Sequence, residues 1–600
     1  MSRFFCFNFC FLFAYLNHAQ YITHGPVLGG LTDSSLNIYL RTNTSQEFTI
    51  EIDQDSLFLN AVLMVDSTLS SRDNSTIIHI HGLNSNTIYF YRFRFGNDVD
   101  QRLGHFKTAP SIGESGNFSF VTGSCQETDN MKVYDVMPTY NPLFMLHMGD
   151  FTYPSYQLNN DYPSQWSSIE LSYQKRYEEM VMKDKLLPFI PLAYMPDDDD
   201  NFGPNRSHHY SVVSTGSFPN LINTFSLDTI SQVERDNCLK GYRSFFPGYP
   251  TVDTTEGHYH SFKIANAEFF ILDTRSMADS PHEAYSYDVD SNLWTFEPDM
   301  NHSILGENQM NWLLNGLSNS TAKWKFIATG VPFNPSMRRI IDAGVMAQGY
   351  LFDIAGESGS GMRLSASLAG YWAGYPSDIE KLVNHVANNQ IEGLIVISGD
   401  AHNNVMDDGT NSVFPELCAS GLSVSSNELA YQMNEYAPLF GQPAVTDSLW
   451  NAGGNGLFNE NFKNAFGRVE VFGEDSVTCC VIDEDNETLA CMTIFADGTV
   501  SSYNSINEIE KNISTQLKLF PNPVLDKLYI DIEPWKDQSK YIVEVIDLYG
   551  KQIIETPFVK TSVSSIGINL DTYFQNGIYK ITLKDSNNQF LGNGKFVILK

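Results

Sequence analysis

The sequence predicts a multidomain protein in which a central domain of layered α/β structure lies between two β-rich domains. Between Gly25 and Thr108 apolar and polar residues alternate with a period of two, which is typical of antiparallel strands. From Asn117 onward, apolar strand patterns alternate with amphipathic helix patterns, which favours a layered α/β sheet. Beyond a polar linker at residues 504–515 the period-two pattern returns, and we expect a small C-terminal β-sandwich over residues 516–600.

The size and charge of the chain limit its partners. It has 600 residues, of which 42% are hydrophobic, enough for several buried cores. With 37 basic and 70 acidic residues the net charge is −33, and such a field repels nucleic acid and anionic membrane surfaces. We therefore expect no nucleic-acid-binding surface, although a small anion can enter a site that metal ions make positive.

Residues 1–19 have the pattern of a secretory signal peptide. Arg3 precedes the apolar run Phe4–Leu16, and Asn17-His18-Ala19 ends on a small residue. The apolar run is short for a membrane span, so an N-terminal anchor is the less favoured alternative. We expect an exported, soluble protein.

Six cysteines remain once the signal is removed. So few cysteines in a large exported chain indicate that apolar cores stabilise it and not a disulfide framework. Cys479-Cys480 and Cys491 flank the turn-like stretch Asp483–Asn486, and this hairpin pattern allows one local disulfide.

Residues 20–110 contain five predicted strands joined by turn residues. These strands are Leu36–Leu40, Phe48–Ile52, Ala61–Val65, Ile77–Ile80 and Ile88–Phe95. Gly82-Leu83-Asn84 followed by Thr87–Tyr91 resembles the turn-and-tyrosine end of fibronectin-like modules. We expect a fibronectin-like β-sandwich that helps to position the rest of the chain and takes no part in catalysis.

Residues 115–503 carry the patterns of the central domain. Amphipathic helices are predicted at Leu171–Lys185, Gly306–Leu317 and Asp378–Asn388. The Gly- and Ser-rich stretch between Asp342 and Tyr375 is too long for a simple connection, and loops of this length are often lids or binding loops.

Four apolar strand patterns of this domain end in clusters of polar side chains. Ligands in α/β sheets bind at the carboxyl ends of strands, so these ends mark the predicted site. The strands and their clusters are Phe118–Val121 with Cys125, Leu143–Met148 with Asp150 and Tyr153, Leu187–Met195 with Asp197–Asn201, and Gly393–Ser398 with Asp400 and His402. A thiol, carboxylates, a phenol and an imidazole together suit metal ions.

Residues 516–600 resemble the C-terminal sorting domain of type IX secretion in Bacteroidetes. The resemblance rests on four motifs in order, at Leu519–Pro523, Val545–Lys551, Asn576–Tyr579 and Gly594–Val597. It implies export across the outer membrane, contact with the type IX secretion machinery, and a secreted or cell-surface location.

From Gly25 to Tyr503 the chain resembles the alkaline phosphatase D (PhoD-like) metallophosphatases. The matching blocks follow in order at Gly25–Gly29, Phe120–Gln126, Gly149–Tyr153, Phe270–Arg275, Leu305–Leu313, Trp372–Pro376 and Ser398–His402. The resemblance implies a metallophosphatase-like central domain that acts on a small phosphate-ester substrate.

The resemblance also implies a centre of ferric iron with calcium. Ferric iron accepts phenolate and carboxylate, and calcium binds oxygen ligands. Such metals bind phosphate oxygens and convert a bound water to hydroxide for in-line attack. By resemblance, the predicted metal ligands are Cys125, Asp150, Tyr153, Asp199, Asp400 and His402, the catalytic residues are Asp200 and Arg275, and the substrate-binding residues are Asn205 and Tyr375.

The chain departs from the family pattern at one block. Where the family has Asp-Asp-His-Asp, this chain has Asp198-Asp199-Asp200-Asn201. Asp200 therefore replaces a histidine that donates a proton or binds the phosphoryl group, and Asp199 keeps a ligand position. An ionised Asp200 repels phosphate, so it must be protonated, bind a cation or leave the step unassisted. A one-residue shift within the four-Asp run is the alternative alignment.

Several of these features have simpler explanations. Gly-Asp after a strand is also an ordinary turn, a run of four Asp is often a solvated loop, and a lone cysteine is often a small buried hydrophobe. Asp273 and Arg275 form either a buried ion pair or a site in which Arg275 contacts phosphate. Trp372 and Tyr375 either line the mouth of a pocket or only pack their loop. His208-His209, His258 and His260 are either metal ligands or, because their spacing does not require that role, surface histidines, which we favour.

Three functions follow from the sequence. The leading prediction is an exported metal-dependent phosphoesterase that acts on phosphomonoesters or phosphodiesters. The second is a cell-surface binding protein that keeps the fold and has lost much of its activity, because the family histidine is absent. The third is a metal-dependent hydrolase of another ester, such as a sulfate ester. The sequence does not predict the oligomeric state.

Overall fold

The computed structural model describes most of the chain between residues 20 and 598. The described residues are 20–154, 162–203, 207, 211–215, 222–226, 230–288, 293–339, 341–342, 368–424, 463–504, 515–520, 524, 527–531, 539–547, 552–559, 565–570, 574, 577–586 and 590–598. The predicted signal peptide, most of the stretch between residues 342 and 375, and most of the predicted linker lie outside them. Within the described ranges, no helix has the length and apolarity needed to cross a membrane.

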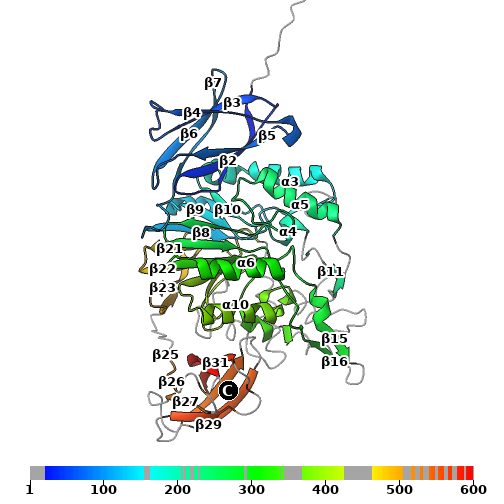
Figure 1. Cartoon of the computed structure of the whole chain (residues 1–600), viewed down its shortest axis with the longest axis vertical. Helices are drawn as coiled ribbons and strands as arrows, with labels where there is room; N and C mark the ends of the chain where they lie inside the picture. Colours follow the sequence, from blue (N-terminus) through cyan, green and yellow to red (C-terminus); the bar gives the residue numbers. More distant parts are fainter. Residues whose placement is uncertain are drawn as a thin grey trace, which may run out of the picture.

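Two large sheets form the centre of the molecule (Figure 1). In order across the first sheet, the strands are β24 (Val500–Asn504), β23 (Thr488–Phe495), β22 (Ser476–Asp483), β21 (Ala465–Phe472), β8 (Phe118–Gly123), β9 (Phe144–His147), β10 (Leu192–Tyr194), β1 (Ile22–Gly29), β2 (Ser35–Thr42) and β5 (Ser75–His81). Those of the second are β13 (His260–Ile264), β14 (Ala267–Ile271), β17 (Trp324–Thr329), β18 (Leu394–Ser398), β20 (Pro415–Ala419) and β19 (Asn404–Asp408). β8, β9 and β10 run parallel, as do β14, β17, β18 and β20.

The two sheets pack face to face through aromatic side chains. Phe120 and Phe144 of the first sheet stack with ring centroids 4.9 Å apart, and Phe269 and Phe326 of the second stack at 4.7 Å. Phe120 meets Phe269 edge to face at 5.4 Å, a favourable geometry that joins the two sheets.

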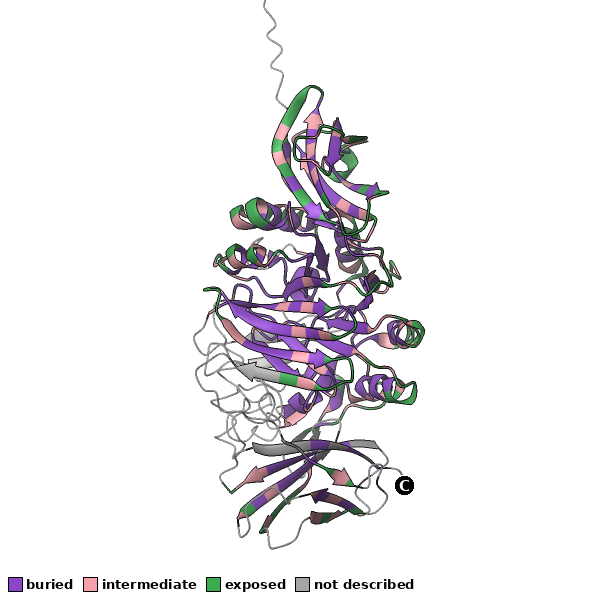
Figure 2. Cartoon of the chain, turned by 90° about the vertical axis from the view of Figure 1, so that its left-hand side faces the viewer, coloured by how far each residue is buried: buried purple, intermediate pink, exposed green. Residues whose placement is uncertain are grey.

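Helices cover the outer side of both sheets. α3 (Trp166–Tyr177) and α5 (Gln232–Phe245) pack on the first sheet, and α6 (Gly306–Asn319) and α10 (Pro376–Asn388) pack on the second. Figure 2 shows the central strands buried, while the helices keep an exposed face. The predicted layered α/β core is therefore confirmed.

The N-terminal strands are joined to the central domain more closely than the sequence predicts. β3 (Glu47–Asp53), β4 (Val62–Ser67), β6 (Ile88–Phe95) and β7 (Asp98–Lys107) form a four-stranded sheet of their own. β1, β2 and β5 instead extend the first large sheet, because Gly29 of β1 pairs in parallel with Leu192 of β10. A period-two pattern predicts a strand but does not reveal its neighbour, and the fibronectin-like topology stays a prediction.

Two predicted elements of the central domain are shorter in the structure. The helix predicted at Leu171–Lys185 is divided, because α3 ends at Tyr177 and a π-helical turn, η3, follows at Met182–Leu186. The strand predicted at Leu187–Met195 is reduced to β10. Pro188 and Pro191 interrupt its first half, because proline lacks the N–H group that strand pairing needs.

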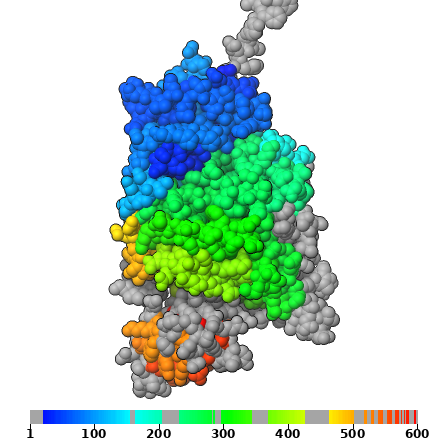
Figure 3. All heavy atoms as spheres, in the orientation of Figure 1, coloured from blue at the N-terminus to red at the C-terminus, as the bar shows by residue number. Residues whose placement is uncertain are grey.

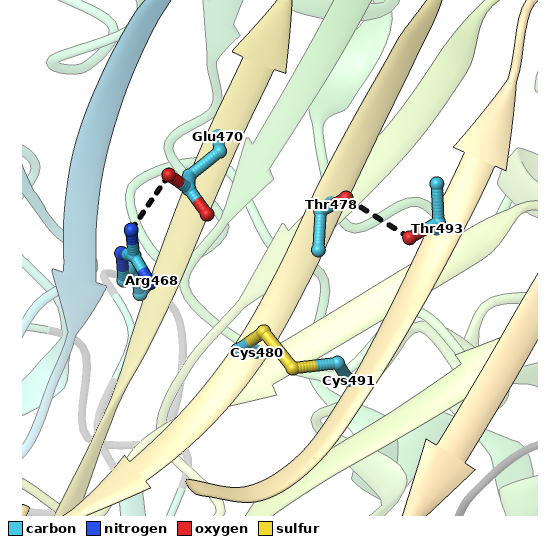
Figure 4. The surroundings of a disulfide bond; sticks show 6 residues. All are labelled: Arg468, Glu470, Thr478, Cys480, Cys491 and Thr493. Carbon is cyan, nitrogen blue, oxygen red and sulfur yellow. Dashed lines mark hydrogen bonds and ion pairs between the residues drawn. A yellow bond between two sulfur atoms is a disulfide. The ribbon is translucent and has the colours of Figure 1, made fainter.

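The β22–β23 hairpin carries the predicted local disulfide. Cys480 and Cys491 lie opposite each other in the hairpin and are bonded (Figure 4). In the turn, the carboxylate of Asp483 accepts hydrogen bonds from the main-chain N–H groups of Asp485 and Glu487. Both the hairpin and the local disulfide are therefore confirmed.

The tail has its own two sheets and its own core. One sheet contains β25 (Thr515–Gln516), β32 (Phe590–Ile598), β31 (Gly577–Asp585), β28 (Lys540–Asp547) and β29 (Gln552–Val559), and the other contains β26 (Leu519–Phe520), β27 (Lys527–Asp531) and β30 (Ser565–Asn569). Buried side chains of both sheets form one hydrophobic cluster made only of tail residues. Figure 3 shows the tail at one end of the molecule and the N-terminal strands at the other.

Candidate metal centre

Polar side chains from both sheets meet at the carboxyl ends of their parallel strands. In the first sheet, the loops after β8, β9 and β10 carry Cys125, Asp150 with Tyr153, and Asp197–Asp200. In the second sheet, the loops after β14 and β18 carry Arg275 and Asp400 with His402. The main-chain N–H of Asp400 donates to Ser124 Oγ at 3.2 Å, which ties the two sheets together at this edge.

The first group of candidate ligands surrounds one oxygen of Asp150. The Tyr153 hydroxyl donates to Asp150 Oδ2 at 3.0 Å, and Cys125 Sγ lies 3.7 Å from the same oxygen. Donor atoms of Cys125, Asp150 and His402 all lie within 4.8 Å of one another. We call Cys125, Tyr153 and His402 the thiol side of the centre.

The second group consists of carboxylates around Arg275. Oxygen atoms of Asp150, Asp198 and Asp400 lie within 4.8 Å of one another. The guanidinium of Arg275 donates to both oxygens of Asp197, at 2.6 and 3.0 Å, and its Nη2 lies 3.3 Å from Asp198 and 3.1 Å from Asp400. We call Asp197, Asp198, Asp400 and Arg275 the arginine side, and Asp150 belongs to both sides.

Four of the candidate ligands share an unusual backbone conformation. Cys125, Asp150, Asp400 and His402 have φ angles of 62°, 56°, 61° and 54°. Residues other than glycine rarely adopt this left-handed conformation, which costs about 1–3 kcal/mol each and persists where the surrounding structure imposes it. Such strain is concentrated at functional sites, so the shared conformation supports a functional role for these loops.

The four-Asp run forms a short helix, α4 (Asp198–Asn201), and its start explains the role of Asp200. Asp197 and Asp200 cap this start reciprocally. Asp200 Oδ1 also accepts a hydrogen bond from the main-chain N–H of Thr152 at 2.5 Å, and Oδ2 accepts one from Asp197 at 3.2 Å. Asp200 therefore fixes the loop that carries Asp150, which favours a positioning role, and its catalytic role stays a prediction.

Asp198, the neighbour of the predicted ligand Asp199, is a further candidate ligand. Asp198, and not Asp199, lies in the group with Asp150 and Asp400. Asp199 contributes its main-chain N–H, which donates to Asp150 Oδ1 at 3.3 Å. The result corresponds to the one-residue shift that the sequence left open.

Gln126 holds two ligand loops together, a role that the sequence did not predict. Its Nε2 donates to the carbonyl of Phe151 at 2.8 Å, and its Oε1 accepts from the hydroxyl of Tyr134. Arg176 donates to the main-chain carbonyl of Gln126 at 2.9 Å. The signals in the sequence are the position of Gln126 next to Cys125 and its place in the matching block Phe120–Gln126, and neither reveals its partners on other elements.

Of the two predicted substrate-binding residues, the structure describes only Tyr375. Asn205 lies outside the described residues. Tyr375 is fully buried, its ring stacks on His302 at 4.6 Å, and its hydroxyl donates to the carbonyl of Asp279 at 2.7 Å. Trp372 is buried as well and donates to Thr329 Oγ1 at 2.8 Å. Both aromatic residues pack their loop, which contradicts the predicted substrate contact of Tyr375.

The sequence favoured surface positions for His258 and for His260, the first residue of β13, but the structure buries both. His258 and His260 are fully buried, and the ring of His258 packs 4.7 Å from that of Tyr242 on α5. Asp273 accepts a hydrogen bond from the main-chain N–H of His258 at 2.9 Å. The Asp273 carboxylate thus holds local backbone, whereas the guanidinium of Arg275 pairs with the arginine side. His208-His209 lie outside the described residues.

Burial raises the pKa values of the acidic groups in the centre. Burial and the charges of Asp198 and Asp199 raise the pKa of Asp150 well above its usual range. Burial is also the largest cause that raises the pKa of Asp400 to about 6. The pKa values of the Cys125 thiol and the Tyr153 phenol are raised by burial first and by Asp150 second. Additional positive charge is therefore needed to keep these groups ionised.

The donor set fits two kinds of cation. The thiol side and Asp150 offer sulfur, phenol, imidazole and carboxylate donors, a combination that suits a transition metal such as iron. The arginine side and Asp150 offer only oxygen atoms, which suits calcium. The chemistry of the residues thus agrees with the metals that the resemblance implies.

The arrangement of two facing sheets recurs in a solved structure. A solved structure described as "Structure of PhoD" superposes with a TM-score of 0.58 at 19% identity and covers 81% of this chain and 92% of that chain, which shows a shared fold. A purple acid phosphatase from yellow lupin (Lupinus luteus) seeds aligns with a TM-score of 0.45 at 11% identity, over 78% of this chain and 74% of that chain.

The chain belongs to the PhoD-like phosphatase family, whose family model matches residues 118–466. Alkaline phosphatase D of Bacillus subtilis (strain 168) is 24% identical over 347 residues, which are 55% of this chain and 53% of that protein. The chain thus spans about half the length of this curated relative. Residues 518–598 match the secretion system C-terminal sorting domain, which confirms the predicted type IX sorting tail.

Proposed function

We propose that the protein is an exported, metal-dependent phosphoesterase that hydrolyses phosphomonoesters or phosphodiesters. The observation that carries the proposal is the meeting of the thiol side and the arginine side at Asp150 within a PhoD-like phosphatase domain. Export is supported by the sorting domain at residues 518–598 and by the signal pattern of residues 1–19.

Two overlapping sets of residues would each hold one cation. Cys125, Tyr153, His402 and Asp150 would hold iron, and Asp150, Asp198 and Asp400 would hold calcium. Such cations supply positive charge to phosphoryl oxygens and the acidity that turns water into hydroxide at neutral pH. Gln126 and Asp200 keep the ligand loops in place through main-chain hydrogen bonds.

Arg275 provides a fixed positive charge beside the carboxylates. Its two hydrogen bonds to Asp197 set the plane of the guanidinium, and the group is almost fully buried. A planar guanidinium matches the geometry of phosphate oxygens. We assign Arg275 to the phosphoryl group. We assign no leaving-group proton to Asp200, because main-chain donors engage both of its oxygens.

The test couples metal content to hydrolysis in the purified full-length mature chain. Iron and calcium are measured by elemental analysis, and turnover of a phosphomonoester, a phosphodiester and a sulfate ester is measured before chelation, after chelation and after metal return. We expect hydrolysis of at least one phosphate ester that chelation abolishes and metals restore. Folded, metal-loaded protein that turns over only the sulfate ester would identify the other hydrolase, and loaded protein without turnover would leave the binding protein.

A further inference from the structure

Two polar residues of the tail, Glu544 and Thr582, are buried on the face of their sheet that points away from the tail's own core. Tyr541, Val543 and Val545 of β28 belong to that core, so Glu544 between them points to the opposite face of the sheet. Glu544 is nevertheless only 6% exposed, and Thr582, its register partner on β31, is 4% exposed. The face is therefore covered over β28 and β31.

The covered area has a clear boundary. Glu555 of β29 lies directly across from Glu544 on the other neighbouring strand, and it is exposed. In Figure 1, β31 lies on the side of the tail that faces the rest of the molecule, and β29 lies on the far side. The cover thus comes from the direction of the phosphatase domain.

Arg339 of the phosphatase domain reaches this covered face. Its Nη2 lies 3.0 Å from Glu544 Oε1, and Lys584 of the tail lies 3.0 Å from Oε2. Each oxygen of the nearly buried carboxylate thus has one cationic partner. Burying an unpaired carboxylate raises the free energy of the folded protein. A glutamate on this covered face is therefore stable only where cationic partners such as Arg339 reach it.

We propose that the sorting domain docks on the phosphatase domain of its own chain, through the outer face of β28 and β31, with Glu544 bridging Lys584 and Arg339. The proposal does not depend on the phosphoesterase activity. One charged pair at an interface is a weak contact, but the tether raises the effective concentration of the tail to roughly millimolar. The docking therefore holds while the tail is attached and is lost when the linker is cut.

Residues 330–339, which we call the docking segment, connect Arg339 to the candidate metal centre. A Cβ atom placed on Gly330 would lie 2.7 Å from Asp197 Oδ1, so the segment begins against the arginine side. The main-chain N–H of Phe333 donates to Glu416 at 2.9 Å, and Asn334 caps the short helix η5 (Pro335–Met337) that leads to Arg339. The tail thus docks on the outer end of a segment whose inner end lies against the centre.

The test compares the full-length mature protein with Arg339→Gln, Glu544→Gln and the double variant. Arg338→Gln is the matched control, because Arg338 pairs with Asp342 and the Phe296 carbonyl within the phosphatase domain. Small-angle X-ray scattering gives the maximum dimension, and trypsin gives the rate of cleavage at Lys511 in the linker. Thermal melts confirm that each variant is folded.

We expect each single variant to increase the maximum dimension and to speed linker cleavage several-fold, with no further change in the double variant. Arg338→Gln is expected to behave as the wild type. In the wild type, cleavage at Lys511 is expected to release the tail on gel filtration. The proposal is overturned if wild type and both single variants have the same scattering profile and cleavage rate, or if the effects of the single variants add in the double variant.

Discussion

The two sides of the candidate centre share Asp150 but offer opposite chemistry. On the thiol side, the donors are a thiol and a phenol whose pKa values are raised by burial, together with the imidazole of His402. On the arginine side, the donors are carboxylates that already have a built-in cation, Arg275. The thiol side therefore suits a strongly Lewis-acidic metal ion that keeps its ligands ionised. The arginine side suits a weaker Lewis acid that binds oxygen ligands.

Removal of the shared residue should break both sides at once. We expect Asp150→Asn to lower phosphate-ester turnover more than about 100-fold, beyond the 10–100-fold that loss of an outer-shell partner of a metal site costs. Iron and calcium contents should fall together, as measured by elemental analysis. Asp135→Asn is the control, because Asp135 is an exposed carboxylate paired with exposed Lys185. Retention of both metals in Asp150→Asn would refute the shared role.

Variants of one side should separate the two cations. We expect Cys125→Ser to lower the iron content with calcium kept, and Asp198→Asn to lower the calcium content with iron kept, each with roughly a 10–100-fold loss of turnover. Asp199→Asn is the companion variant, because the direct alignment of the four-Asp run makes Asp199 the ligand and its charge also acts on Asp150 and Tyr153. If Asp199→Asn loses calcium and Asp198→Asn does not, the ligand register read from the structure is wrong.

Asp200→His tests whether loop contacts govern that position or whether the direct alignment, which puts the family histidine there, is correct. A buried imidazole cannot accept from both Thr152 N–H and Asp197 N–H, so an unsatisfied donor should destabilise the fold by about 1–3 kcal/mol. We expect turnover to fall about tenfold, measured with the same esters beside a urea denaturation curve. Thr152→Val, which loses only a hydroxyl donor, should have a smaller effect. Turnover above the wild-type value in Asp200→His would show that the position is catalytic.

Glu416 is a buried carboxyl group outside the two candidate ligand groups, so it tests how burial alone changes the pH dependence of stability. Of the four predictions, it has the smallest expected effect on turnover. Burial raises the pKa of this carboxyl from 4.5 to about 7, although Ser398 Oγ donates to it at 2.7 Å. The unfolded chain therefore loses this proton at lower pH than the folded chain, and stability falls as pH rises from about 4.5 to about 7.

Glu416→Gln removes this penalty. We expect the variant to match the wild type in stability below pH 4.5 and to exceed it by up to about 3 kcal/mol above pH 7, with turnover unchanged. Urea denaturation at pH 5 and pH 8 measures the difference. A stability gain that is the same at both pH values would mean that the proton is not involved.

The parts of the site that the sequence predicts are those that follow strong strand patterns. Cys125, Asp150 and Asp400 each come after an apolar run, and parallel strands bring such positions to one edge. The four-Asp run does not reveal which of its residues is the ligand, because four identical residues can be aligned with the family pattern in more than one way. The register is set by the capping box of α4, and the Asp-x-x-Asp spacing of Asp197 and Asp200 is the signal that would have indicated it.

Features that depend on distant partners are absent from local patterns. His258 and His260 look like ordinary polar residues, and only the packing of Tyr242 and Tyr249 over them explains their burial. The pairing of β1 with β10 is likewise invisible in a period-two pattern, because the alternation of side chains is the same for any neighbour.

The pairing of β1 with β10 has a consequence for the order of folding. Gly29 needs Leu192 beside it, and Asn37 donates to the carbonyl of Gly248 at 2.9 Å. A chain that folds as it is synthesised therefore presents β1 before its neighbour β10 has been made. Until then this strand has an open edge, the feature that recruits other chains into aggregates. β1 and β2 must therefore wait for β10 and for the segment around Gly248, and the chain is most prone to aggregate in that interval.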